Sequence, residues 1–258
     1  MVSAHRAFGG RRAIAAALVA AAALGGFAGG AGAAPAWVQK ALALGRSGDR
    51  QIAAPTTARY LSDEGGQFVL DRSGRQPLLK FDDSPEVWAL SAARGPRGDI
   101  IYFNDLGEPF LRATKLSGMT VFTARRPEGS AVALVGATGP LRLAPLGPVA
   151  LYQRLYQASV HATRAAQHLV GFDAPDADAG SDGLIADAAA LAVDAMVALA
   201  ARPGGRARLA HIGKVALTPG PAPAVKLRAG VMTIVVVPPL GLAGRPSSER
   251  ILRALGGK

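Results

Sequence analysis

The sequence predicts an α+β fold: a largely antiparallel β meander, arranged as a sandwich or a partly open barrel, with an inserted two-helix hairpin and a short C-terminal helix. Three observations predict it. Residues 59–144 consist of short apolar segments separated by turns rich in Gly, Asp and Pro. Over residues 148–202 the apolar spacing becomes helical, and strand-like segments return over residues 208–255. We expect residues 59–258 to form one domain.

The meander contains a near-repeat. Residues 68–74 read FVLDRSG and are followed by PLLKF at 77–81; residues 101–107 read IYFNDLG and are followed by PFLRA at 109–113. Each unit reads as a strand, a turn with an acidic residue and glycine, and a second strand that begins with proline. This alternation of apolar and polar positions is typical of a half-buried antiparallel sheet. Weaker strands are expected at residues 131–135 and 141–143.

Two helices are expected next. Apolar residues recur at helical spacing from 148 to 170, with arginine and histidine on the opposite face. A second helix is predicted from about 184 to 201, ended by the PGG sequence at 203–205. The alanines of both segments allow close packing, so we expect an antiparallel hairpin.

The last part of the chain returns to strands, at residues 208–217, 224–227 and 230–237. The segment 230–237 is apolar throughout and is predicted to be a central strand. We expect these strands to complete the same sheet system as the meander. Ser247 or Ser248 is predicted to cap a final helix.

The N-terminus predicts a secretory signal peptide over residues 1–33. Three arginines precede an uncharged apolar run at 13–24, and small residues follow. Cleavage is expected after Ala33 or after Ala36. The apolar run is short for a transmembrane span, and the alternative, a retained membrane anchor, is disfavoured by the glycines at 25, 26, 29 and 30. Residues 34–58 are expected to form a short helix and a linker. We therefore predict an exported protein of the periplasm or the extracellular space.

The composition is basic and free of cysteine. Removing the signal peptide lowers the formal net charge from +11 to +8. Such a charge suits contact with an anionic envelope component, either a lipid headgroup or an acidic polysaccharide. The arginines are scattered, so nucleic acid is not predicted as a partner. The absence of cysteine excludes disulfides, thiolate catalysis and cysteine metal sites.

The best local candidate for a site is the start of the last helix. Free N–H groups at a helix N-terminus, two hydroxyls and a guanidinium can hold a phosphate or carboxylate. The candidate anion-binding residues are Gly244, Arg245, Ser247 and Ser248. The alternative is an ordinary helix cap preceded by a surface arginine.

Asp71 and Asp105 are the alternative candidates, as a pair of carboxylates. They lie at corresponding turns of the two repeat units, and glycoside hydrolysis needs two converging carboxylates. However, aspartate before glycine commonly bonds its own backbone in a turn. We favour the turn interpretation.

Other polar residues do not form a recognisable catalytic or metal-binding motif. His161 and His168 lie two helical turns apart, too far to share a metal ion, and are expected to be solvated. The segment between the helices carries four aspartates, at 173, 176, 178 and 182, but lacks the order of a calcium-binding loop. We predict a solvated acidic loop, and no metal or cofactor.

Several segments together resemble a known family. They read GQFVLDRSG at 66–74, PRGD at 96–99, FLR at 110–112, GMTVF at 118–122 and AGRPSS at 243–248. In these the chain resembles a family of exported alphaproteobacterial proteins that is catalogued only as a domain of unknown function. The resemblance covers most of the mature chain and implies no activity, ligand or site residues.

The function that these observations favour is non-enzymatic: binding or structural support of an anionic envelope component. The alternative is a hydrolase of envelope polysaccharide or lipid that uses Asp71 and Asp105. A third possibility is a subunit of an envelope complex, with an unknown protein partner. Converging carboxylates in a deep pocket would favour the enzyme, and exposed arginines gathered on one side would favour the binder.

Overall fold

The structure is a computed structural model that describes residues 54–256. The predicted signal peptide, and the short helix predicted after it, lie outside the described residues. The described residues form two separate sheets, and two clusters of buried hydrophobic side chains accompany them.

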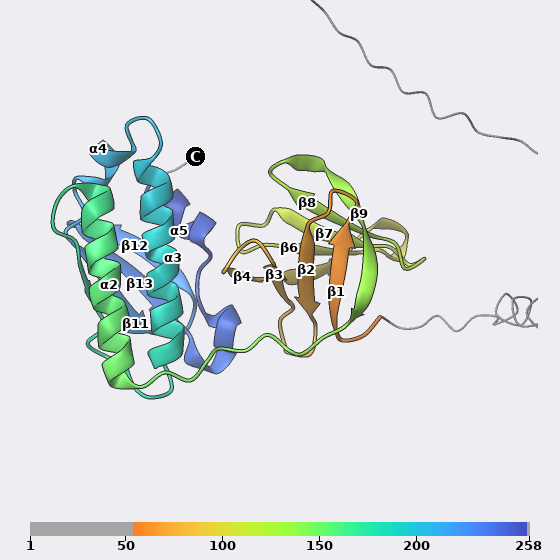
Figure 1. Cartoon of the computed structure of the whole chain (residues 1–258), viewed down its shortest axis with the longest axis horizontal. Coiled ribbons are helices and arrows are strands. Elements are labelled where there is room, and N and C mark those ends of the chain that lie inside the picture. The colour runs from red at the N-terminus through yellow and green to blue at the C-terminus, as the bar shows by residue number, and fades with distance from the viewer. Residues whose placement is uncertain (1–53, 257–258) are drawn as a thin grey trace, which may run out of the picture. The chain divides into compact units, whose positions relative to one another are not determined.

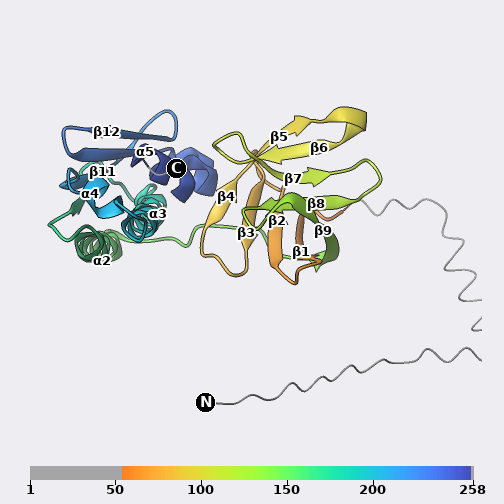
Figure 2. The same cartoon turned by 90° about the horizontal axis from the view of Figure 1, so that it is seen from above.

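The first sheet is an antiparallel meander of nine strands. Its strands are β1 (Thr57–Ser62), β2 (Gln67–Asp71), β3 (Leu78–Phe81), β4 (Val87–Ala89), β5 (Ser91–Arg94), β6 (Ile100–Phe103), β7 (Pro109–Ala113), β8 (Met119–Thr123) and β9 (Arg126–Ala137). The spatial order is β4-β3-β2-β1-β9-β8-β7-β6-β5. The two edge strands, β4 and β5, are separated in the chain only by Leu90, so the sheet curls into a nearly closed barrel (Figure 2). Of the two predicted forms, the structure shows the barrel.

The predicted near-repeat is confirmed as two three-stranded units, β2–β3–β4 and β6–β7–β8. Their apolar side chains fill the barrel, where Phe68, Leu79 and Leu111 are fully buried. Phe68 also stacks on the ring of Tyr60, with ring centroids 5.4 Å apart. The strand predicted at 131–135 is confirmed as part of the longer strand β9. The strand predicted at 141–143 is wrong, because these residues are irregular.

The second sheet belongs to a small α/β unit at the C-terminal side of the chain. Its elements are α2 (Pro148–Ala166), β10 (Gly171–Asp173), α3 (Asp182–Ala200), α4 (Gly205–Leu209), β11 (Lys214–Pro219), β12 (Ala224–Arg228), β13 (Val231–Val236), the 3-10 segment η2 (Pro238–Gly244) and α5 (Ser248–Ala254). The strand order is β10-β11-β13-β12. β10, β11 and β13 are parallel, and β12 is antiparallel to β13.

The expectation that the C-terminal strands complete the meander sheet is therefore wrong. They pair with β10, which lies inside the segment predicted to be a loop between the two helices. The connection from β10 to β11 passes through α3, and a long helical crossover of this kind places the two strands parallel. β13 is central, as predicted, because it lies between β11 and β12.

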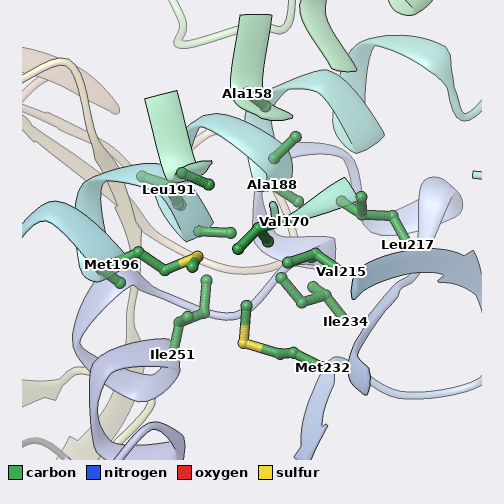
Figure 3. Packing of buried hydrophobic residues seen from close by; sticks show 14 of the residues in the cluster. Ala158, Val170, Ala188, Leu191, Met196, Val215, Leu217, Met232, Ile234 and Ile251 are labelled. Carbon is green, nitrogen blue, oxygen red and sulfur yellow. The ribbon is translucent and has the colours of Figure 1, made fainter. Parts of the chain in front are cut away.

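The core of the α/β unit lies between the sheet and its helices. α2 and α3 lie side by side over the sheet of β11, β12 and β13 (Figure 1). The predicted antiparallel arrangement of these helices is wrong, because β10 lies between them in the chain and their first turns line the same pocket. Met232 and Ile234 of β13 point into the same cluster as Ala188 and Leu191 of α3, as Figure 3 shows. Burial along β13 alternates residue by residue, so one face of the strand packs on the helices. α3 is long and apolar enough to cross a membrane by length and composition, and half of that stretch is buried inside the fold.

Candidate functional site

The predicted cap of the last helix is confirmed. Ser247 is the N-cap of α5, and its hydroxyl accepts a hydrogen bond from the backbone N–H of Arg250 at 3.0 Å. This is the bond that an N-cap serine makes with the third residue of a helix. The local sequence was sufficient to place it.

The donors of this helix start are bound by carboxylates of the chain itself. Asp105 accepts hydrogen bonds from the backbone N–H of Ser247 at 2.9 Å and from its hydroxyl at 2.6 Å. Glu86 accepts from the backbone N–H of Ser248 at 2.9 Å and from its hydroxyl at 2.5 Å. The helix start thus stabilises two internal anions. An external phosphate would have to displace them, and its binding stays a prediction.

Arg245 and Gly244 are buried at this junction. The Arg245 guanidinium pairs with Asp187 of α3 and donates to the carbonyl oxygen of Val87 in β4 at 3.0 Å. Its side chain is 1% exposed, so the interpretation as a surface arginine is wrong. Gly244 lies so close to the backbone of Val237 that a Cβ would meet the Val237 oxygen at 2.1 Å. The contacts of Arg245 and the close backbone approach at Gly244 therefore explain both residues structurally.

Burial perturbs two carboxyl groups of the same junction. Desolvation raises the pKa of Glu86, against the Ser248 donors and the nearby Arg245 charge. Desolvation also raises the pKa of Glu249, and the neighbouring carboxylates Glu108, Glu86 and Asp105 add to the rise. The junction therefore concentrates acidic groups that sequence reasoning did not bring together, because Glu86 and Ser248 are 162 residues apart.

Asp71 and Asp105 have entirely different partners. Asp71 accepts hydrogen bonds from Thr57, from Ser73 and from the backbone N–H of Leu141, whereas Asp105 binds Ser247. The described residues thus hold the two carboxylates in separate hydrogen-bond networks, and nothing in them supports the hydrolase alternative.

The supposed equivalence of Asp71 and Asp105 in the repeat is also wrong. The turn contact that Asp71 makes to the N–H of residue i+2 is made in the second unit by Asn104, whose side-chain oxygen accepts from Leu106 at 3.0 Å. Asp105 is the following residue. It is therefore free to reach Ser247.

Asp71 supports a prediction on pH. Although burial opposes it, the hydrogen bonds from Ser73, Leu141 and Thr57 lower the pKa of Asp71 below its ordinary value. The charged form is therefore favoured in the folded state, so its stabilisation is complete above the unfolded-state pKa of about 4 and is lost as the pH falls through the lower folded-state pKa. We expect Asp71→Asn to lower the free energy of unfolding by about 2 kcal/mol at pH 7. The difference from wild type should shrink below about pH 4.

Urea unfolding at a series of pH values measures both quantities. Asp63→Asn is the control, because Asp63 is exposed, and we expect a change within about 0.5 kcal/mol at every pH. A difference between Asp71→Asn and wild type that stays constant from pH 7 to pH 3 would rule out the linkage.

The histidines and the acidic loop also have structural contacts. His168 is half-buried, and its ring nitrogens lie 3.0 Å from the carbonyl oxygen of Ala166 and 2.9 Å from that of Ile212, so the expectation that it is solvated is wrong. His161 is exposed, as predicted. Among the described residues, no group of three or more His, Asp or Glu side chains gathers in a way that could hold a metal ion.

The positive charge of the protein is unevenly distributed. Residues 54–137, which form the barrel, carry ten Lys and Arg and ten Asp and Glu. Residues 138–256, which include the α/β unit, carry twelve Lys and Arg against seven Asp and Glu. Within the described chain, the net charge therefore comes from the C-terminal unit.

Five exposed arginines of this unit gather at one end, which we call the arginine end: Arg164, Arg202, Arg206, Arg208 and Arg228. The fold brings them together because α4 packs against both α2 and α3 (Figure 1). The loop after α4 joins the turn between β12 and β13 through a hydrogen bond from Gly213 to Gly230. The acidic residues described in this unit lie elsewhere: on the segment before α3, along α3 and at the start of α5.

The arginine end was not predicted. Its members are spread over 65 positions of the sequence, from Arg164 to Arg228, with no run that would signal a patch. Only the segment around the short helix α4 offered a local signal, because Arg202 and Arg206 flank the PGG sequence at 203–205 and Arg208 follows two residues later.

Fold and site together define an α+β protein in which a meander barrel is followed by a small α/β unit with a basic end. The chain belongs to the family described as domain of unknown function DUF4908, whose model matches residues 38–255. No curated protein matches the chain, and no solved structure matches it.

Proposed function

We propose that this protein is an exported, non-enzymatic binding protein whose arginine end contacts an anionic component of the cell envelope. The observation that carries the proposal is the gathering of five exposed arginines at one end of the α/β unit, while the barrel is electrically neutral. Exposed arginines on one surface attract phosphate and carboxylate groups through charge and through bidentate hydrogen bonds. The expected export of the chain would bring this surface to the envelope.

Removal of three charges from the arginine end tests the proposal. We expect the triple variant Arg164→Gln, Arg206→Gln and Arg228→Gln to bind vesicles containing anionic lipid about a hundredfold more weakly than wild type. Each basic residue near such a surface contributes about 1 kcal/mol, and 1.4 kcal/mol corresponds to a factor of ten. Cosedimentation of residues 34–258 with the vesicles at low salt measures the affinity.

A charge-matched variant of the barrel is the control. Arg75→Gln, Arg94→Gln and Arg125→Gln remove the same net charge from exposed positions outside the α/β unit. We expect this variant to bind nearly as well as wild type. Equal losses in the two triple variants would show that net charge alone drives binding, and would contradict a specific basic end.

Two kinds of anionic ligand distinguish binding of phosphate from binding of carboxylate. Vesicles of anionic lipid and a soluble acidic polysaccharide such as polygalacturonate present phosphate and carboxylate respectively. Binding to either should weaken steeply with salt, because the contact is electrostatic and exposed. If the protein bound neither the vesicles nor the polysaccharide at low salt, the proposal would be wrong.

A further inference from the structure

A pocket of about 510 Å³ lies beside α2, at the far end of the helices from the arginine end. It is formed by the first half of α2, by the end of β10 and the residues after it, and by the first turn of α3. This volume falls in the range of small-molecule sites. The pocket also lies at the carboxyl end of a parallel strand, the edge of an α/β sheet where ligands commonly bind.

Asp182 is the most unusual residue of this pocket. It is 3% exposed and lines the pocket in the first turn of α3. Within the described residues its carboxylate accepts no hydrogen bond and forms no ion pair. Among the described residues, the fully buried side-chain atoms without a partner are the Tyr60 hydroxyl and Arg72 Nε. The Asp182 oxygens are not among them, so the carboxylate keeps some contact with solvent at the pocket, next to the positive end of the α3 dipole.

Each of the other three aspartates of the same segment has a hydrogen-bond or ion-pair partner. Asp173 pairs with Lys214, Asp176 accepts a hydrogen bond from Thr218, and Asp178 accepts from the N–H groups of Gly180 and Ser181. The segment predicted as a solvated acidic loop is therefore a set of local contacts from which one buried carboxylate is left over. It lines the pocket together with Asp173, whose carboxylate is paired with Lys214.

The walls of the pocket suit an organic cation. Tyr152 and Tyr156 lie one helical turn apart on α2, line the pocket and are 76% and 72% exposed. Phe172 and Pro175 add apolar surface, and none of the described lining residues is Lys, Arg or His. Aromatic faces attract cations, although more weakly at exposed side chains such as these than where water is excluded. A buried carboxylate next to such faces is the arrangement that binds an ammonium group on an apolar body.

We propose that this pocket binds a small organic cation, an ammonium group carried on an apolar body, with Asp182 as its counter-ion and Tyr152 and Tyr156 against its apolar part. Charge complementarity carries the proposal, because the lining is acidic although the α/β unit as a whole is basic. The site is independent of the arginine end and takes a ligand of opposite charge.

Matched pairs of probes test the proposal by NMR titration of the protein, residues 34–258. Phenethylamine is compared with 2-phenylethanol, and choline with 3,3-dimethylbutan-1-ol, so that each pair differs mainly in charge. We expect at least one of the two cations to shift the resonances of residues around the pocket in a saturable way. Its neutral partner should bind at least tenfold more weakly.

Three variants localise the effect. Asp182→Asn keeps the size of the side chain and should weaken binding of the cation at least tenfold, and Tyr156→Leu should weaken it several-fold while leaving the fold intact, because Tyr156 is exposed. Asp194→Asn removes a carboxylate from the exposed surface of the same helix and should have no effect. Equal binding of the neutral probes, binding by neither cation at 10 mM, or unchanged binding in both pocket variants would overturn the proposal.

Discussion

Replacing Arg245 with methionine is expected to lower the free energy of unfolding by about 3 kcal/mol. The guanidinium is 1% exposed, pairs with Asp187 and donates to the carbonyl oxygen of Val87 at 3.0 Å. Methionine fills much of the same volume but leaves both partners without their donor. Breaking a buried ion pair on one side costs about 3–5 kcal/mol. We expect the lower end of this range, because the Asp187 side chain is 31% exposed and water can solvate its charge when the arginine is removed.

Arg253→Met is the matched control. Arg253 also belongs to the C-terminal segment and pairs with Glu108, but both side chains are more than half exposed. Exposed ion pairs contribute about 0–1 kcal/mol, so this variant should unfold at nearly the same urea concentration as wild type. Similar losses in the two arginine variants would show that Arg245 does not join the barrel to the α/β unit in the way described.

Replacing Gly244 with alanine is the second change with a large expected effect. The added Cβ would lie 2.1 Å from the oxygen and 2.9 Å from the carbonyl carbon of Val237, and 3.2 Å from a methyl group of Leu184. The N–H of Val237 also donates to the Gly244 oxygen at 2.6 Å, which closes the η2 segment. The backbone has to move apart and lose this bond. Overpacking of this kind costs about 1–3 kcal/mol and occasionally more, and we expect about 3 kcal/mol.

Thermal unfolding followed by circular dichroism measures the loss as a fall in Tm. Gly139→Ala is the control, because a Cβ there meets nothing within 4 Å, and its stability should stay within about 1 kcal/mol of wild type. A Gly244→Ala protein as stable as Gly139→Ala would mean that the close approach of residues 237 and 244 is not required by the fold.

The parts of the fold that local patterns determine were predictable. Turns with Gly, Asp and Pro marked the β meander, and helical spacing marked α2 and α3. The strand β10 was missed because it has only three residues, Gly171–Asp173, and its apolar content is a single Phe172. Without β10 there was no reason to expect a parallel sheet, so the C-terminal strands were assigned to the meander.

The contacts of the predicted site depended on residues far away in the sequence. Arginine is rarely buried in proteins, and the partner that makes burial of Arg245 possible, Asp187, lies 58 positions earlier. The serines at the start of α5 were recognised as a cap, whereas the carboxylates of Glu86 and Asp105 that bind them were not. Sequence reasoning identified the donors correctly but had no information on which acceptors the fold supplies.

Asp182 was not predicted as a site residue for a different reason, the position of the helix start. The predicted second helix begins at Leu184, so Asp182 was assigned to the loop before it, whereas α3 begins at Asp182 itself. A shift of two residues moves this carboxylate from a solvated loop to a buried first turn. Helix boundaries are uncertain by about this amount when they are read from spacing alone.

Arginine footprinting on an anionic surface tests the central claim most directly. Phenylglyoxal modifies accessible arginines, and mass spectrometry measures its rate at each one in the presence and absence of vesicles that contain anionic lipid. The arginine end predicts strong protection of Arg164, Arg206 and Arg228 by the vesicles, with unchanged rates at Arg75 and Arg94 of the barrel. Protection of the barrel arginines, or equal protection everywhere, would contradict the account.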